Sequence, residues 1–357
     1  MSLVALSHSH KKFKGMECLE PRRHFCTEHT AESLGGDASV AESAVFQAFN
    51  ATTTNSTNLQ WTEVGDTPQA REEGISAVSG SRLYMFGGFF NQRFEATPRV
   101  DIYNPATNTW SRGADMMFNT THTPIITTAT RAFFFGGYVG RDPGPATAAV
   151  QIYNFKTNKW TRGPDMPSPR GAHAAVLSGN MVYLFGGRNK PRTAEFAETW
   201  SFNIDTNEYK VIARMPDPRN HLAGAAVDGQ IYAIGGQKGE VANSVNLDLV
   251  HRYNPNRNRW FAAPDVPAAI SHQLSSTLVF DKKIITVGGE TSHNVASQSV
   301  RVFDPYANSW SSLSSLPLVR RAGFAGIVND RIYMAGGSIV GVSQTEVFRS
   351  VNLDTIF

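Results

Sequence analysis

Arginine, histidine and glutamate side chains recur in the polar segments that separate short apolar runs of this sequence. The candidates for ligand binding or proton transfer are Arg170, Arg188, Arg219, His221, His272, Glu290 and Arg320. Arginine forms paired hydrogen bonds with carboxylates and phosphates, and a histidine or glutamate beside it could act as a general acid or base. These residue types therefore predict a ligand-binding site that would suit an anionic ligand.

A structural role is the alternative for the same side chains. Arg170 and Arg219 occupy the same place in two similar segments, MPSPRG and MPDPRN, and Arg320 lies in the variant LPLVRR. A repeated arginine can hydrogen-bond the carbonyl groups of neighbouring loops. A histidine near the start of a strand can line a channel without reacting. Both interpretations remain open on the sequence alone.

Several catalytic centres find no support in the sequence. The chain has two cysteines, Cys18 and Cys26, and both lie near the N-terminus. Their spacing from His24 and His29 matches no zinc finger, and no disulfide can crosslink the rest of the chain. There is no Gly-x-Ser-x-Gly elbow and no glycine loop between a strand and a helix that could cradle phosphate. We therefore expect no cofactor and no metal.

The elements that would position these side chains form a repeat. A Gly-Gly pair ends a short apolar run at Gly88, Gly137, Gly187, Gly236, Gly289 and Gly337. The runs are rich in aromatic and branched residues, as in LYMFGG and VYLFGG, which is typical of a short buried strand. Glycine fits a crowded position near the axis of a repeat structure, where backbones approach closely.

A second signal lies between the Gly-Gly pairs. Two large aromatic residues stand seven positions apart in Tyr103/Trp110, Tyr153/Trp160, Phe202/Tyr209, Tyr253/Trp260 and Phe303/Trp310. The intervening residues are rich in asparagine, aspartate and proline, which predicts a tight turn between two strands. We expect the aromatic side chains to pack between adjacent sheets.

Together the two signals define units of four strands with a period of about 50 residues. Sheets of this size can bury both faces by stacking around an axis, which gives a β-propeller. The Gly-Gly, Tyr-Asp/Asn-Pro and Trp spacing resembles the kelch repeat, six times over residues 59–357. The resemblance implies one propeller blade for each repeat, so the expected fold is an all-β, six-bladed propeller of four-stranded antiparallel blades.

Closure of the ring follows from an unmatched strand at each end. Trp61 has no aromatic residue seven positions before it, and the last unit ends at Phe357 without a fourth strand. The segment LQWTEV around Trp61 is therefore expected to complete the last blade and leave no open edge. In such a blade, the loops between strands 2 and 3 and between blades leave on one face. This geometry predicts that the candidate residues surround one mouth of the channel.

Residues 1–58 carry no such repeat and are expected to form a flexible tail. Leu19-Glu20-Pro21-Arg22 resembles the Leu-Glu-Pro-Arg motif at the N-terminus of planctomycete surface proteins, although His24 and Phe25 stand where that pattern has leucines. The resemblance implies a bacterial protein exported or placed at the cell surface, with a cytoplasmic location as the alternative.

Charge and hydropathy narrow the classes of partner. Lysine and arginine number 33 against 30 aspartate and glutamate, a net charge of +3. Such a weak field does not imply nucleic acid, and no run of 18 apolar residues predicts a transmembrane helix. The remaining expectation is a non-enzymatic module that binds a protein or a glycan, possible anionic ligands included, through the mouth of the propeller.

An enzyme is the alternative function. Some bacterial six-bladed kelch proteins resemble a sialic-acid (N-acetylneuraminate) epimerase, which needs a general acid and a general base over the channel. His221 and Glu290 with Arg219 could supply such groups. Galactose-oxidase-like chemistry is not expected, because its Cys–Tyr cross-link needs a cysteine in the propeller, and both cysteines precede residue 59.

Overall fold

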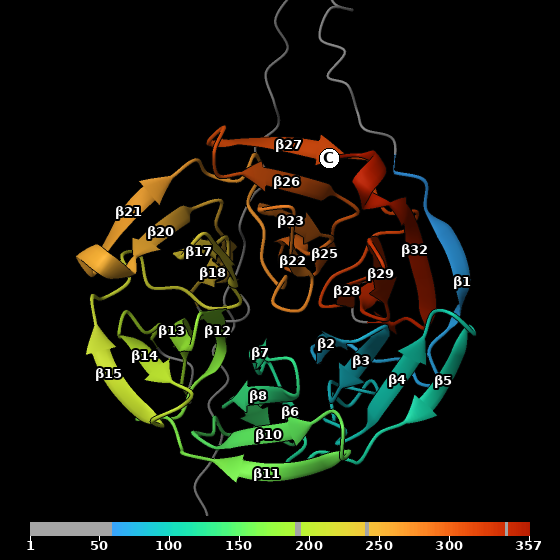
Figure 1. Cartoon of the computed structure of the whole chain (residues 1–357), viewed down its shortest axis with the longest axis horizontal. Coiled ribbons are helices and arrows are strands. Elements are labelled where there is room, and N and C mark those ends of the chain that lie inside the picture. The colour runs from blue at the N-terminus through green and yellow to red at the C-terminus, as the bar shows by residue number, and fades with distance from the viewer. Residues whose placement is uncertain (1–58, 190–193, 240–242, 340–341) are drawn as a thin grey trace, which may run out of the picture. The chain divides into compact units, whose positions relative to one another are not determined.

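The computed structural model describes residues 59–189, 194–239, 243–339 and 342–357. These residues form six antiparallel sheets of four strands each, arranged around a channel (Figure 1). Successive innermost strands contact one another, and the last of them contacts the first. The described residues therefore form a closed six-bladed β-propeller, as the sequence predicts.

The blades are numbered here in chain order, and their strands run from the channel outward. Blades 1 to 3 consist of β2 (Ile75–Ser79), β3 (Arg82–Phe86), β4 (Val100–Asn104) and β5 (Thr109–Arg112); β7 (Ile125–Thr127), β8 (Arg131–Phe135), β10 (Val150–Asn154) and β11 (Lys159–Gly163); and β12 (Gly171–Ser178), β13 (Met181–Arg188), β14 (Thr199–Asn203) and β15 (Glu208–Ile212). Blades 4 to 6 consist of β16 (Ala223–Val227), β17 (Gln230–Ile234), β20 (Val250–Asn254) and β21 (Arg259–Ala263); β22 (Thr277–Phe280), β23 (Lys283–Val287), β26 (Val300–Asp304) and β27 (Ser309–Leu313); and β28 (Phe324–Val328), β29 (Arg331–Ala335), β32 (Glu346–Asn352) and β1 (Thr62–Asp66).

Short elements lie in the connections. Two-stranded ladders pair β6 (Thr120–Thr121) with β9 (Tyr138–Val139), β18 (Gln237–Lys238) with β19 (Val245–Asn246), β24 (Glu290–Ser292) with β25 (Val295–Ala296), and β30 (Ser338–Ile339) with β31 (Val342–Ser343). Single 3-10 turns occur at η2 (Pro255–Arg257) and η3 (Leu353–Thr355).

The aromatic pairs predicted from the seven-residue spacing lie directly opposite each other in the outer hairpins. Tyr103 faces Trp110 across β4 and β5, and Tyr253 faces Trp260 across β20 and β21. The side chains of Trp160, Tyr209, Trp260 and Trp310 also reach the preceding blade; for example, Trp260 Nε1 donates to Ala213 O at 2.9 Å. Where tyrosine replaces tryptophan, Tyr209 Oη makes the equivalent bond to Pro164 O at 3.2 Å. The aromatic positions therefore join neighbouring blades.

Closure by the N-terminal strand is also confirmed. β1 pairs antiparallel with β32, with Thr62 opposite Arg349 and Asp66 opposite Glu346. Leu59 is buried in the cluster between blades 5 and 6, and Trp61 packs against that cluster. Figure 1 shows the blue strand beside the red C-terminal strand in the same blade. The ring is therefore held shut by hydrogen bonds between its two ends.

The Gly-Gly pairs lie where the second strand of a blade meets the loop before the first strand. Gly87 and Gly88 have φ angles of +60° and +93°, which favour glycine. A Cβ atom on Gly88 would lie 2.6 Å from Glu72 O. Close packing against that loop, together with the positive φ angles, accounts for glycine here.

The N-terminal tail, its cysteines and the Leu19–Arg22 motif lie outside the described residues. Within the described part of the chain, no helix has the length and hydrophobicity needed to cross a lipid bilayer.

Candidate functional site

A cavity of about 260 Å³ opens at one end of the channel. Described residues from all six blades line it: Glu72, Glu73, Phe89, Phe94, His122, Asp142, Arg188, His221, Gln237, His272, Glu290, His293, Asn294 and Arg321. All of them belong to loops or strand ends that lead into or out of the first two strands of a blade. We call this space the mouth cavity.

Two repeat positions build the wall of the mouth cavity. One is the residue directly after each Gly-Gly pair, such as Arg188, Gln237 and Glu290. The other lies in the loop before the first strand and pairs with it through a β-bridge, as Ser271 does with Glu290. The same bridge joins Arg321 to Ser338. The scaffold therefore holds residues of different types at these two equivalent positions of the blades, close to the mouth.

A closed ring of backbone hydrogen bonds forms the floor. The residues of the ring are Glu73, His122, Ala172, His221, His272 and Ala322, one from each blade, and all have positive φ angles. Each amide donates to the carbonyl of the ring residue in the adjacent blade, over 2.8 to 3.2 Å. For example, His221 N donates to Ala172 O and Glu73 N to Ala322 O. We call this set the axial ring.

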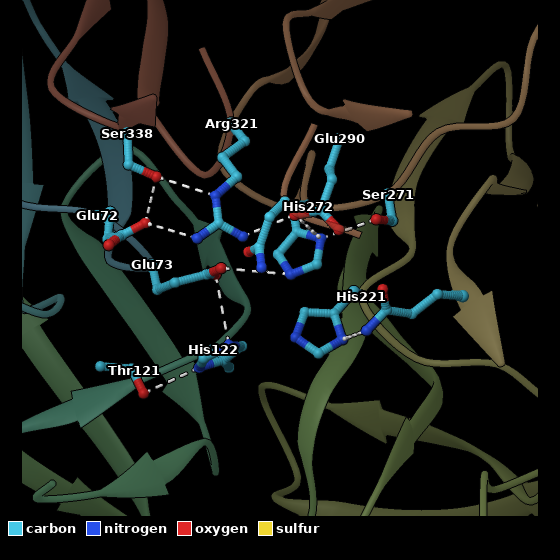
Figure 2. A network of polar contacts seen from close by, with 12 residues as sticks. Glu72, Glu73, Thr121, His122, His221, Ser271, His272, Glu290, Arg321 and Ser338 are labelled. Carbon is cyan, nitrogen blue, oxygen red and sulfur yellow. Dashed lines mark hydrogen bonds and ion pairs between the residues drawn. The ribbon is translucent and has the colours of Figure 1, made fainter. Parts of the chain in front are cut away.

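Arg321 is the centre of a polar network on one side of the cavity (Figure 2). Its Nη1 atom donates to Glu290 Oε2 at 2.6 Å, and its Nε atom donates to Ser338 Oγ at 3.0 Å. Its Nη2 atom lies 3.5 Å from Glu72 Oε2, which also accepts a hydrogen bond from Ser338 Oγ. Burial alone would lower the pKa of Arg321, but Glu72, Glu73 and Glu290 raise it.

Glu73 projects from the axial ring between two histidines (Figure 2). Its carboxyl oxygens lie 3.5 Å from His122 Nε2 and 3.4 Å from His272 Nε2. Burial raises the pKa of Glu73 to about 8, with the charge of Arg321 opposing and those of Glu72 and Glu290 assisting the shift. Glu73 is therefore mainly a neutral carboxylic acid at pH 7.

His272 is the corresponding neutral base. Burial lowers its pKa to about 4; Glu290 opposes this shift and Arg321 assists it. Its Nδ1 atom lies 2.7 Å from Ser271 Oγ, and its ring stacks on that of His221 with 4.2 Å between the ring centroids. His272 and Glu73 thus form an adjacent base and acid, both uncharged near neutral pH.

Substitution of Glu73 by glutamine is expected to change how stability depends on pH. Below the unfolded-state pKa of about 4.5 Glu73 is protonated in both states, and between pH 4.5 and 8 the folded state holds the extra proton. The wild type should therefore lose stability as pH rises through this window, and Glu73→Gln should not. We expect the variant to gain on the order of a few kcal/mol relative to wild type between pH 5 and 8, measured by chemical unfolding at several pH values.

The exposed Glu63 on β1 provides the control. Glu63→Gln should follow the wild-type pH dependence. A constant difference between Glu73→Gln and wild type from pH 5 to 8 would contradict the assignment of a buried, protonated carboxyl.

The structure divides the seven residues singled out in the sequence into two groups. Arg188, His221, His272 and Glu290 line the mouth cavity. Arg170, Arg219 and Arg320 do not line it and are fully buried inside their blades.

These three arginines make the contacts of the structural alternative. Arg219 Nε donates to Gly235 O at 2.6 Å. Arg320 Nη2 donates to Glu346 Oε2 at 2.7 Å. All three side chains contact the scaffold, have no exposed surface and lie outside the lining of the mouth cavity. The proposed combination of His221 and Glu290 with Arg219 is replaced in space by a combination with Arg321.

Several lining residues were not among those candidates. Glu72, Glu73 and the aromatic pair Phe89 and Phe94 carry no motif of their own. Phe89 follows a Gly-Gly pair, and Glu73 lies 49 residues before His122, one repeat earlier. Two features of the sequence could have identified these residues. One is the position directly after each Gly-Gly pair, and the other is the alignment of Glu73 with the histidines at the same place in other repeats.

Metal binding finds no support at this site. Within the ranges that the structure describes, no three histidine, cysteine, aspartate or glutamate side chains are placed to hold a metal ion together. The histidines of the axial ring are instead engaged with Glu73, with side chains of their own loops and with one another.

The comparisons with known proteins agree with the repeat and the fold. Residues 121–337 match the family model of the KLHDC2/KLHL20/DRC7 Kelch-repeats domain, and residues 76–117 match the Kelch motif. A Kelch repeat-containing protein of Arabidopsis thaliana is 25% identical over 307 residues, covering 78% of this chain and 71% of that protein. Human Kelch-like protein 23 is 30% identical over 263 residues, covering 74% of this chain and 45% of that protein.

A solved structure, that of YjhT, superimposes with a TM-score of 0.66 at 15% identity, covering 79% of this chain and 95% of that one. This likeness concerns the fold. The chain spans less than half the length of Kelch-like protein 23, so the activities of such longer proteins do not transfer directly. The family model that covers residues 121–337, together with six blades of the predicted register, shows that this chain belongs to the kelch-repeat family.

Proposed function

We propose that this propeller is a non-enzymatic recognition module whose protein or glycan ligand enters the mouth cavity. The observation that carries the proposal is the convergence of the variable repeat positions on one cavity, while the invariant positions build the scaffold. A cavity of about 260 Å³ accommodates a single side chain or sugar unit of a larger ligand. Concave sites with a few convergent polar groups are the usual place of ligand binding.

The charge of the ligand is a separate part of the proposal. The sequence allowed an anionic ligand because of its arginines, but Arg170, Arg219 and Arg320 lie inside the blades. The guanidinium groups that remain at the cavity are those of Arg188 and Arg321. Support for an anionic ligand therefore depends on these two residues.

Narrowing the cavity is expected to weaken ligand binding. His293 is an exposed lining residue, and its replacement by tryptophan would fill part of the opening. The full chain can be screened against a random peptide library and a glycan array. His293→Trp should reduce the signal of genuine ligands at least about tenfold, which corresponds to about 1.4 kcal/mol.

The matched control places the same bulky side chain on the other end of the propeller. Thr157 is exposed in the hairpin between β10 and β11, and such hairpins lie at the opposite end of a blade from the mouth loops. Thr157→Trp should leave the signal unchanged. Ligands that lose binding with Thr157→Trp and keep it with His293→Trp would contradict the proposed site.

A carbohydrate-active enzyme, such as a sialic-acid epimerase, is the second candidate. It is favoured by one observation, the neutral acid Glu73 3.4 Å from the neutral base His272. An acid and a base of this kind could exchange a proton on carbon with solvent. Deuterium incorporation into N-acetylated sugars in D₂O, lost in Glu73→Gln, would favour this function over simple recognition.

We also propose an extracytoplasmic or cell-surface location, with the cytoplasm as the alternative. Its support is the resemblance of Leu19–Arg22 to a surface-protein motif, in a part of the chain that the structure does not describe. A surface location would favour glycan or matrix ligands, and a cytoplasmic one would favour protein partners.

A further inference from the structure

The two guanidinium groups of the mouth cavity already have partners, although Arg188 Nε lacks one. Arg321 has Glu72, Glu290 and Ser338 around its guanidinium, with its closest contact at 2.6 Å. Arg188 is 1% exposed, and its Nη1 atom donates to Gly239 O at 2.8 Å. An anionic ligand would have to displace these partners before it could bind Arg321 or the Nη1 atom of Arg188.

Hydrogen-bond acceptors of the same cavity lack donors. Glu290 is 1% exposed and Gln237 is 4% exposed. Among the residues that the structure describes, no donor reaches Glu290 Oε1 or Gln237 Oε1. A buried acceptor without a partner is costly, and a ligand that donates hydrogen bonds would remove that cost. Of the three buried side-chain atoms of described lining residues that lack a hydrogen-bond partner, these two acceptors call for a donor, and the third, Arg188 Nε, is itself a donor.

The formal charge of the lining points the same way. Among the described lining residues, four carboxyl groups (Glu72, Glu73, Asp142 and Glu290) face two guanidinium groups (Arg188 and Arg321). With Glu73 protonated, as burial favours at neutral pH, three negative charges remain against two positive ones. The field of the cavity is thus weakly negative at neutral pH and more negative above pH 8.

An aromatic wall completes the site. Phe89 and Phe94 meet edge to face with 5.6 Å between their centroids, and Phe94 is 38% exposed. Phe89 also contacts His122 at 5.8 Å. Aromatic faces attract cations, most strongly where water is partly excluded.

We propose that the mouth cavity accepts a cationic group, the ammonium or guanidinium of a basic side chain presented by a protein partner. The group would donate to Glu290 Oε1 and Gln237 Oε1, and its aliphatic stem would contact Phe89 and Phe94. This inference rests on the proposed function of the mouth cavity and specifies its ligand. It reverses the anionic preference that the sequence allowed.

Capped amino acids test the inference on the full chain. The probes are Nα-acetyl-arginine amide, its uncharged isostere Nα-acetyl-citrulline amide, Nα-acetyl-glutamate amide and N-acetylglucosamine. Binding is measured by NMR titration at pH 7. We expect the arginine probe to bind at least about tenfold more tightly than the other three.

Two isosteric substitutions locate the binding. Glu290→Gln removes a carboxylate of the cavity and should weaken the arginine probe at least about tenfold, with little effect on the citrulline probe. Glu346→Gln removes a carboxylate paired with Arg320 at a similar distance, 2.7 Å, outside the cavity. It should leave both affinities unchanged. Circular dichroism at the titration temperature verifies that both variants remain folded.

The pH dependence provides a second reading. The titratable groups that face Glu73 are Glu72, His122, Asp142, His272, Glu290 and Arg321. Ionisation of its carboxyl should strengthen binding of the arginine probe from pH 7 to 9, because the probe stays cationic, and Glu73→Gln should remove that gain.

The alternative outcomes each overturn the inference. Preference for the glutamate probe would show an anion site, and preference for N-acetylglucosamine would show a glycan site; either would leave the proposed binding function of the cavity standing. Equal binding of arginine and citrulline probes, or no binding of the arginine probe up to about 50 mM, would also overturn it. The proposed function is tested separately by the library screen and His293→Trp.

Discussion

Deletion of residues 59–66 is expected to lower the midpoint of thermal unfolding by about 10 °C or more. These residues contain β1, which pairs with β32 and completes blade 6. Without them, β32 becomes an open sheet edge, and the cluster between blades 5 and 6 loses Leu59 and Trp61. Blade 6 would then be held by β28, β29 and β32 alone. Calorimetry of the full-length chain and of the internal deletion measures the effect.

An equal deletion in the tail is the control. Residues 43–50 carry no part of the repeat, and their removal should shift the midpoint by no more than about 1 °C, because the six four-stranded sheets are complete without them. Equal effects of the two deletions would contradict closure of the ring by β1.

Replacement of Arg170 by alanine is expected to reduce the free energy of unfolding by about 3–5 kcal/mol. Arg170 is fully buried, and its guanidinium carbon lies 3.6 Å from the ring centroid of Trp200. Its Nη1 atom donates to Gly186 O and Glu198 O, at 3.3 and 3.0 Å. The substitution would leave a large void and two carbonyl groups without these donors. Urea unfolding monitored by tryptophan fluorescence measures the loss.

Arg131 supplies the matched control, because it also lies over an aromatic ring, that of Phe133 at 5.1 Å, but is exposed. Arg131→Ala should cost less than about 1 kcal/mol. A similar small cost for Arg170→Ala, combined with a specific loss of ligand binding, would restore Arg170 as a binding residue and contradict the scaffold role.

The sequence was sufficient to predict the propeller because the repeat has redundant signals. Tyr103 and Trp110 stand seven residues apart because a short turn brings them opposite each other in a hairpin. The pairing of the Trp61 strand with the last blade could be predicted for the same reason, because a last blade of three strands would break the pattern of the other five. Each such signal depends on local geometry, which spacing records directly.

The candidate site was only partly predictable. Arg170 and Arg188 both lie in segments that the sequence places at the mouth, yet Arg170 is buried against Trp200 and Arg188 lines the cavity. The direction in which each side chain points depends on its place in the repeat. Arg170 lies in the loop before the first strand of its blade, and Arg188 directly follows the Gly-Gly pair. To predict this direction, one must know the register in which two strands from different ends of the repeat pair. Residue type does not encode that register.

Glu73 shows a second limit of the sequence. Nothing local marks this residue in the segment REEG, and its raised pKa arises from burial beside residues that lie about 50 to 250 positions away. Its place in the axial ring becomes visible when the repeats are aligned with His122, His221 and His272. Electrostatic properties of this kind belong to the assembled mouth rather than to a motif.

The central claim is that ligands bind at the mouth cavity rather than elsewhere on the propeller. Hydrogen–deuterium exchange of the full chain, with and without a ligand recovered from the library or array, tests it most directly. The account predicts that protection is concentrated in segments 71–74, 120–123 and 288–292. Protection concentrated in the hairpin segments 104–109 and 154–159, with the mouth segments unchanged, would contradict it.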